Sequence, residues 1–88
     1  MSLNTKHMTI EFAIGIPMQV VVCSTPKMLL HNYVRTDPRH QGIEHDAVHG
    51  HCHVEYSIHM DLEREWAWYR VKAQYEDAEV ALLRRLSL

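Results

Sequence analysis

The stretch HVEYSIHMDLEREWAWYRVKAQY, residues 53–75, decides the expected fold of this chain. Apolar and polar residues alternate along both of its halves, which is the pattern of β-strands that each bury one face. The apolar positions of the first half are Val54, Tyr56, Ile58, Met60 and Leu62. Those of the second half are Ala67, Tyr69, Val71, Ala73 and Tyr75. A short turn near Glu63 to Trp66 then gives a hairpin whose two apolar faces coincide.

The polar face of this hairpin also favours the pairing. It sets Glu55, His59 and Asp61 across from Arg70, Lys72 and the two tryptophans. Opposite charges that face each other across two strands contribute about 0.2 to 1 kcal/mol per pair. The turn contains no Gly or Asn, so a helix over residues 61–75 is the alternative.

The first half of the chain carries weaker signals. TIEFAIGI, residues 9–16, alternates and predicts a strand, and the β-branched MQVVVC predicts a second strand at 18–23. KMLLHNYVRT, residues 27–36, fits a strand or a short helix, and we expect a strand. DPRHQG has turn chemistry and predicts the start of a polar, His-rich loop that runs to about Gly50.

The tail EDAEVALLRRL predicts a helix, because its acids come first and Arg84 and Arg85 come last, as the helix dipole favours. We expect an apolar stripe of this helix to face the sheet, formed by Ala78, Leu82, Leu83 and Leu86. The predicted fold class is α+β, a small antiparallel β-sheet with a C-terminal helix packed on one face. Residues 1–7 are expected to be a flexible leader, with Met8 as an alternative start, and residues 8–88 a single α+β domain.

Composition narrows the function classes. The 88 residues carry a net charge of −2, so charge alone gives no reason to expect a nucleic-acid partner. The two cysteines, Cys23 and Cys52, form no C-x-x-C pattern, which favours a reducing compartment. With no apolar window of about 18 residues and no signal peptide, we expect a cytoplasmic protein without a membrane partner.

Histidines are concentrated in one region, because six of the eight fall between His40 and His59. If the strand begins early, His49, His51 and His53 line one face at intervals of about 6.5 to 7 Å. With His45 they are the candidate ligands of a zinc or nickel ion, and Asp46 or His59 could also complete the site. Two alternatives stay open.

In the first alternative, the histidines only face solvent. In the second, His49 or His53 acts as a general base beside Asp46 or Glu55. Cys52 alternates to the face opposite its flanking histidines, so we expect it in the core rather than as a nucleophile.

A second candidate surface lies on the outward face of the last predicted strand, where Trp66, Trp68, Arg70 and Lys72 share one parity. Aromatic rings between cations can stack bases and neutralise phosphates, as in RNA-binding sheets. Neighbouring exposed tryptophans also form an apolar patch of the kind that protein interfaces cover. We favour a homodimer interface over a nucleic-acid surface here.

The segment VRTDPRHQGIEHDAVHGHCHVEY, which begins at Val34 and is followed by paired strands and a terminal helix, resembles the small toxin proteins of the TumE type. The resemblance covers about residues 34–55. Those proteins carry an Asp-Asn step, whereas Asn follows neither Asp37 nor Asp46, and the histidine spacing differs. The resemblance implies a growth-inhibiting toxin of a toxin–antitoxin system that acts on RNA or another target, with His49, His51 and His53 as the carried-over positions.

We therefore expect a small cytoplasmic metal-binding or protein-interaction module with a His-rich site at a loop–strand junction, acting as a homodimer. The alternative is a toxin-type, metal-independent ribonuclease, with an antitoxin or RNA as its partner. Such an enzyme needs a cation near the histidines to stabilise phosphate charge, and Arg70 and Lys72 are the candidates. No complete catalytic signature decides whether the chain is an enzyme.

Overall fold

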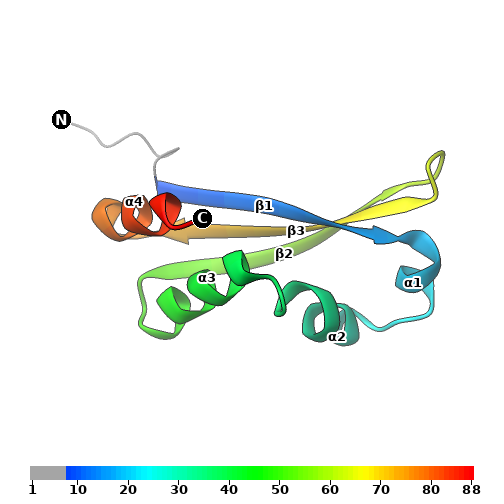
Figure 1. Cartoon of the computed structure of the whole chain (residues 1–88), viewed down its shortest axis with the longest axis horizontal. Coiled ribbons are helices and arrows are strands. Elements are labelled where there is room, and N and C mark those ends of the chain that lie inside the picture. Colours follow the sequence, from blue (N-terminus) through cyan, green and yellow to red (C-terminus); the bar gives the residue numbers. More distant parts are fainter. Residues whose placement is uncertain (1–7) are drawn as a thin grey trace.

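The fold, seen in a computed structural model that describes residues 8–88, is built on one three-stranded sheet. The predicted leader, residues 1–7, lies outside the described residues. The strands are β1 (Thr9–Pro17), β2 (Cys52–Asp61) and β3 (Trp66–Tyr75), and they are arranged in the order β1-β3-β2 with every pair antiparallel (Figure 1). Residues 8–88 also form four α-helices and a short π-helix, which confirms the α+β class.

The predicted hairpin is confirmed, and no helix forms over residues 61–75. β2 and β3 pair in one register from Cys52↔Tyr75 to Asp61↔Trp66. This register sets Tyr56 opposite Val71 and therefore brings the two apolar faces together. β1 pairs with the other edge of β3, which makes β3 the central strand.

The hairpin turn, residues 62–65, forms without Gly or Asn because the Asp61 side chain organises it. Its Oδ1 accepts a hydrogen bond of 3.2 Å from the backbone N–H of Arg64. Glu65 takes up the left-handed conformation, with φ at 53°. The Glu65 carbonyl accepts a hydrogen bond of 3.1 Å from the backbone N–H of Met18, which ties the turn to the end of β1.

The two strands expected between residues 18 and 36 are wrong, because this segment is helical. It forms α1 (Met18–Val22), α2 (Pro26–Leu29) and the π-helical turn η2 (Leu30–Val34). The start of α2 has a clear local cause. The Thr25 hydroxyl accepts a hydrogen bond of 3.2 Å from the backbone N–H of Met28, and Pro26 occupies the first turn, where its missing N–H costs nothing.

The His-rich loop expected from residue 37 to Gly50 is also wrong, because most of it is the helix α3 (Pro38–Val48). Asp37 and Pro38 serve as cap and first residue of the helix rather than as a turn. The Asp37 carboxylate accepts a hydrogen bond of 2.9 Å from the backbone N–H of Arg39. Gly42 does not mark a loop either: a Cβ there would lie 2.6 Å from Nη1 of Arg84, so glycine makes room for that side chain.

The C-terminal helix is confirmed as α4 (Ala78–Leu86). The prediction of which side of this helix faces the sheet is wrong. Ala81 is fully buried and Arg84 is partly buried, whereas three of the four stripe residues are exposed: Leu82, Leu83 and Leu86. Arg84 explains this orientation, because its ion pair with a buried carboxylate of α3 requires that side of the helix to face inward.

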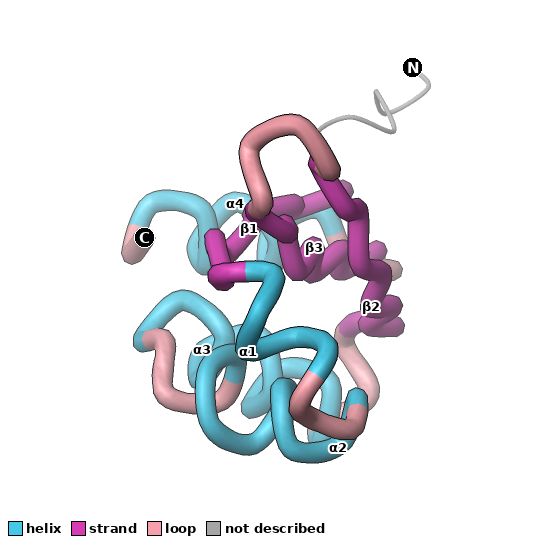
Figure 2. Tube along the Cα trace, turned by 90° about the vertical axis from the view of Figure 1, so that its right-hand side faces the viewer, coloured by secondary structure: helices cyan, strands magenta, loops and turns pink. Residues whose placement is uncertain are grey.

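The hydrophobic core lies between one face of the sheet and the helices (Figure 2). At one end of the sheet, Ile10, Ile43, Tyr75 and Ala81 join β1, α3, β3 and α4. At the other end, Ile16, Leu29, Val34 and Tyr69 join β1, α2, η2 and β3. The opposite face of the sheet has no helix over it in the described part of the chain. Within residues 8–88, none of the helices has the length and apolar character needed to cross a membrane.

We expect Glu65→Gly to raise the free energy of unfolding by about 0.5 to 1 kcal/mol, because a side chain in the left-handed region is strained and glycine is not. Denaturant unfolding measures this. The matched control is Glu63→Gly in the same turn, whose φ is not positive. It should have no effect or reduce stability, and equal effects of the two changes would contradict the explanation.

Candidate functional site

The four candidate metal ligands come from three different places in the fold. His45 lies in the last turn of α3, His49 caps its end, His51 lies in the turn that follows, and His53 is the second residue of β2. The ring centroids are 4.3 Å apart for His45 and His49, and 6.4 Å apart for His49 and His51. All four side chains are exposed.

The expected line of three histidines on one strand face is therefore wrong. β2 begins at Cys52, because α3 continues to Val48, and of these three histidines only His53 lies on the sheet. The ring nitrogen Nδ1 of His49 lies 2.9 Å from the backbone carbonyl oxygen of His45, which suits an Nδ1–H donor and leaves Nε2 facing solvent. Across the described residues, no three His, Cys, Asp or Glu side chains are grouped so that they could hold one ion. Zinc or nickel binding stays a prediction.

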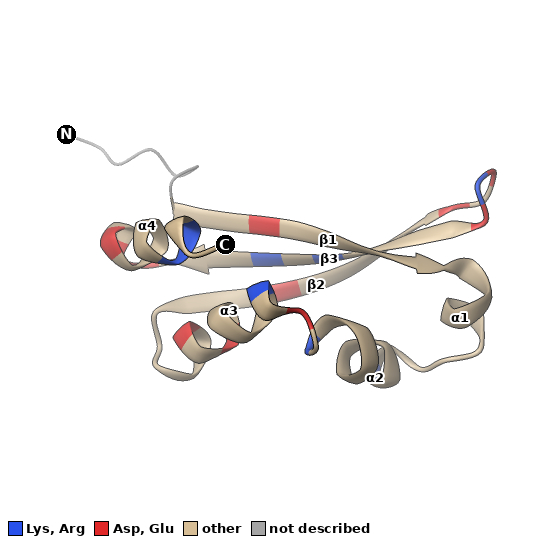
Figure 3. Cartoon of the chain, viewed as in Figure 1, with Lys and Arg blue, Asp and Glu red and all other residues tan. Residues whose placement is uncertain are grey.

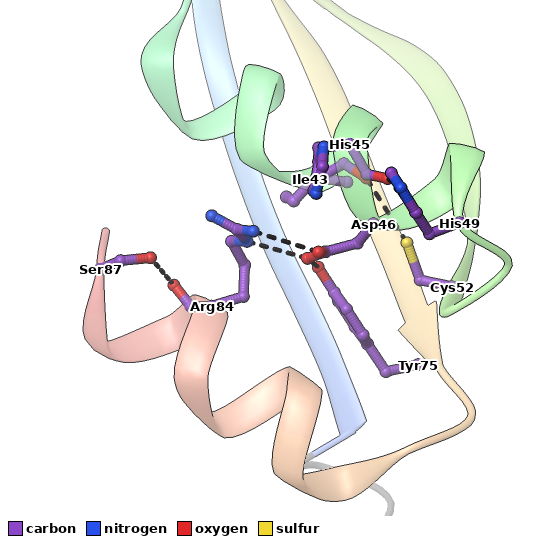
Figure 4. Close-up of polar contacts among 8 residues, drawn as sticks. All are labelled: Ile43, His45, Asp46, His49, Cys52, Tyr75, Arg84 and Ser87. Carbon is purple, nitrogen blue, oxygen red and sulfur yellow. Dashed lines mark hydrogen bonds and ion pairs between the residues drawn. The ribbon is translucent and has the colours of Figure 1, made fainter.

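Asp46, considered as a metal ligand or as the partner of a catalytic histidine, is committed elsewhere (Figure 4). Its buried carboxylate accepts a hydrogen bond of 2.6 Å from the Tyr75 hydroxyl. It also accepts two from Arg84, at 2.8 Å from Nε and 3.1 Å from Nη2. Burial alone would raise the pKa of Asp46, but the hydrogen bonds from Arg84 and Tyr75 outweigh it and hold that pKa below its usual value.

Cys52 lies half-buried against the core, as expected. Its sulfur is 3.6 Å from the backbone carbonyl oxygen of Ile43. Burial raises the pKa of the thiol, which disfavours the nucleophilic thiolate. The position favours a packing role for Cys52.

His40 is the unusual histidine, and sequence reasoning assigned it no role. Its side chain is completely buried on α3, and neither ring nitrogen has a hydrogen-bond partner in the described part of the chain. Its Nε2 lies 3.5 Å from a Glu44 carboxylate oxygen, and its ring centroid lies 5.8 Å from that of Tyr56 on β2. Burial lowers the pKa of His40 and outweighs the opposing effect of Glu44. Helical spacing from His40 to Ile43 was the available signal, but it is visible only once α3 is known to be a helix.

The outward face of the sheet carries the second predicted surface, and its four residues do share that face. Trp68, Arg70 and Lys72 lie along β3, opposite His59, Ser57 and Glu55 of β2. On the other side Lys72 faces Glu11 of β1, so an acid flanks it on each neighbouring strand (Figure 3).

Trp66 is partly covered by its own chain. A Cβ at Gly15 would lie 2.5 Å from the indole nitrogen of Trp66, so the indole packs directly on the Gly15 backbone. Trp68 is 40 % exposed, and its ring meets that of Trp66 edge to face at 6.5 Å. Trp68 is therefore the more exposed of the two tryptophans.

The edge strand β2 forms a third surface, which sequence reasoning did not identify. The Glu76 N–H donates to the His51 carbonyl at 3.1 Å, which marks the odd-numbered residues of β2 as the ones that exchange hydrogen bonds with β3. The even-numbered residues point their main-chain groups to the free edge. Within residues 8–88, none of the hydrogen bonds outside helices and sheet involves Val54, Tyr56, Ile58 or Met60.

Apolar side chains accompany this free edge. The even-numbered residues are on the face turned toward the helices, but the helices do not cover them fully. The exposed fractions are 40 % for Tyr56, 38 % for Ile58, 37 % for Met60 and 76 % for Leu62. Leu29 of α2 packs in the core with Ile16 of β1 and Tyr69 of β3, and neither core cluster includes Tyr56, Ile58 or Met60.

Comparison of the chain with protein-family models, with curated proteins and with solved structures gives no significant match in any of the three. The three surfaces are therefore the basis on which a function can be assigned.

We expect His40→Leu to raise the free energy of unfolding by about 1 kcal/mol at pH 7, because it removes two buried polar atoms that have no partner. The folded state lowers the pKa of His40, so the unfolded chain takes up a proton there that the folded chain resists. The pH-dependent contribution of neutral His40 to the free energy of unfolding is therefore fully present above about pH 6.5, and it is lost as the pH falls below that value.

The advantage of His40→Leu over the parent should therefore grow between pH 7 and pH 5. Denaturant unfolding across this range measures the effect, with the exposed His31→Leu as the control. A variant that is less stable than the parent at every pH would show that His40 is satisfied in the folded state.

Proposed function

We propose that this protein is a small protein-interaction module that binds its partner by strand addition to the free edge of β2. One observation carries the proposal. β2 points main-chain N–H and C=O groups to its free edge, and the same strand carries a row of half-exposed apolar side chains. Strand addition uses these two features, since the main chain supplies affinity and alternate side chains supply specificity.

The other edge of the sheet is less suited to this role. β1 ends at Pro17, which has no N–H, and Arg85 donates a hydrogen bond to the Thr9 carbonyl near its start. β2 has neither Pro nor Gly over its ten residues. An unprotected edge of this length invites another strand, and proteins commonly cover or interrupt such edges.

A direct test uses Ile58→Pro. The Ile58 N–H points away from β3, so proline there removes a donor from the free edge without removing a bond of the hairpin. The probe is a fluorescent dodecapeptide with alternating Val and Thr, and binding is measured by anisotropy. We expect the parent to bind the strand-forming peptide and Ile58→Pro to bind at least tenfold more weakly.

The matched control is Pro at the same type of position on the other edge strand, Ala13→Pro, which should bind like the parent if it folds. Circular dichroism establishes that each variant is folded. Peptide binding by the parent that Ile58→Pro leaves unchanged would contradict docking on β2, and no binding by the parent would remove strand addition as the mechanism.

A toxin-type ribonuclease is the second candidate, and the outward face favours it through one group of residues. His59 lies directly opposite Trp68, with Arg70 diagonally adjacent, so a base, a stacking surface and a cation occur together. His53 is diagonal to Lys72 in the same way. The two histidines are six residues apart on β2, about 20 Å, so they cannot act on one phosphate together.

This second candidate predicts that the purified protein cleaves single-stranded RNA in the presence of a chelator, and that His59→Ala lowers the rate at least 100-fold. His31→Ala is the control, because it removes an exposed histidine from η2 rather than from this face of the sheet. Cleavage that His59→Ala does not change would come from another site or a contaminant. RNA that stays intact with the parent would exclude the enzyme.

A further inference from the structure

The free edge of β2 also suggests what binds to it. We infer that the partner is a second copy of this chain, whose β2 pairs antiparallel with the first about a two-fold axis at Ser57. This inference rests on the proposed function, because it names the strand that is added. The pairing joins two three-stranded sheets into one six-stranded sheet.

The main-chain geometry restricts the pairing. In each copy only the even-numbered residues of β2 direct their N–H and C=O groups to the free edge, so even-numbered residues must pair with even-numbered ones. A two-fold axis at Ser57 satisfies this condition. It pairs Tyr56 with Ile58 of the partner, both of which are half-exposed, and it sets the half-exposed Met60 against the partly buried Val54 of the partner.

Hydrogen-bonding complementarity between carboxylates and imidazoles favours this register. With the axis at Ser57, Glu55 faces His59 of the partner and His53 faces Asp61 of the partner. These odd-numbered residues form the pairs without mutual hydrogen bonds, in which side chains approach most closely. By symmetry the dimer contains each pair twice, so four acid–histidine contacts line the outward face of the joint.

The neighbouring registers are worse. An axis at Tyr56 sets His53 against His59 of the partner, which opposes two residues of the same kind. An axis at Ile58 sets Glu55 against Asp61 of the partner, which opposes two acids. Like charges directly opposite each other destabilise a strand pair. Among these three, only the axis at Ser57 places every acid against a histidine.

The geometry leaves room for this partner. Among residues 8–88, β2 pairs with β3 alone, and it forms the outer margin of the sheet when the molecule is seen end on (Figure 2). The apolar row continues past the helices toward the hairpin turn, where Leu62 is the most exposed member. A second copy would cover this row, whereas the expected dimer interface at Trp66 and Trp68 has one tryptophan already packed on Gly15.

Sedimentation equilibrium of the full chain tests the inference with two single substitutions. His59→Glu creates two Glu–Glu contacts in the dimer, and we expect self-association to weaken about tenfold. Glu55→Lys replaces the two symmetry-related Glu55 side chains that face His59 in the dimer. We expect this change to weaken self-association less than His59→Glu does. In an equimolar mixture of the two variants, one contact of the mixed dimer sets the introduced lysine against the introduced glutamate, and the other keeps Glu55 against His59. The mixture should therefore associate more tightly than either variant alone.

The control is His45→Glu, which changes the same type of residue on α3, away from the joint, and should leave association unchanged. A parent that sediments as a monomer at about 100 μM would overturn the inference, as would a dimer in which mixing the variants restores nothing. A monomeric parent that still binds the Val-Thr peptide would refute the second copy as partner and leave strand addition to β2 intact.

Discussion

The pairing of β2 with β3 is the constraint on which the rest of the structure depends. Its register, from Cys52↔Tyr75 to Asp61↔Trp66, sends one set of side chains toward the helices and the other toward solvent. Because hydrogen bonding alternates along an antiparallel pair, the same register also decides which main-chain groups remain at the free edge. The core, the outward surface and the open edge all follow from this one alignment.

A second interaction fixes how the helices sit on this sheet. Asp46 of α3 binds both Tyr75 at the end of β3 and Arg84 of α4, so one buried carboxylate holds three elements together (Figure 4). Burial of a charge is unfavourable unless it is paired and hydrogen-bonded, and here both conditions are met. The pair also fixes the rotation of α4, which is why its leucines face outward although an apolar stripe usually faces a core.

The hairpin, β1 and the presence of α4 could be predicted because their signals are local. Period-two alternation over ten residues needs no knowledge of the rest of the chain. Residues 18–48 were mispredicted because their signals are ambiguous: β-branched residues favour strands, and Asp37-Pro38 suits a turn as well as a helix start. The contacts that decide these cases are long-range, such as Gly42 against Arg84.

The candidate sites show the same division. Sequence reasoning placed Trp68, Arg70 and Lys72 on one face correctly, because parity suffices for that. It could not place His45, His49 and His51, since their positions depend on where α3 ends. It also could not find the free edge of β2. Whether a strand lies at the edge or in the centre of a sheet depends on the strand order, here β1-β3-β2, and the sequence of a single strand does not reveal it.

Amide hydrogen exchange along β2 tests the central claim most directly, because it reads the two edges of one strand separately. The amides of Glu55, Ser57 and His59 should be protected at every protein concentration, since they donate to β3. The amides of Tyr56, Ile58 and Met60 should be protected at high concentration and lose that protection on dilution. Even-numbered amides that exchange at unprotected rates at the highest concentration would contradict the account.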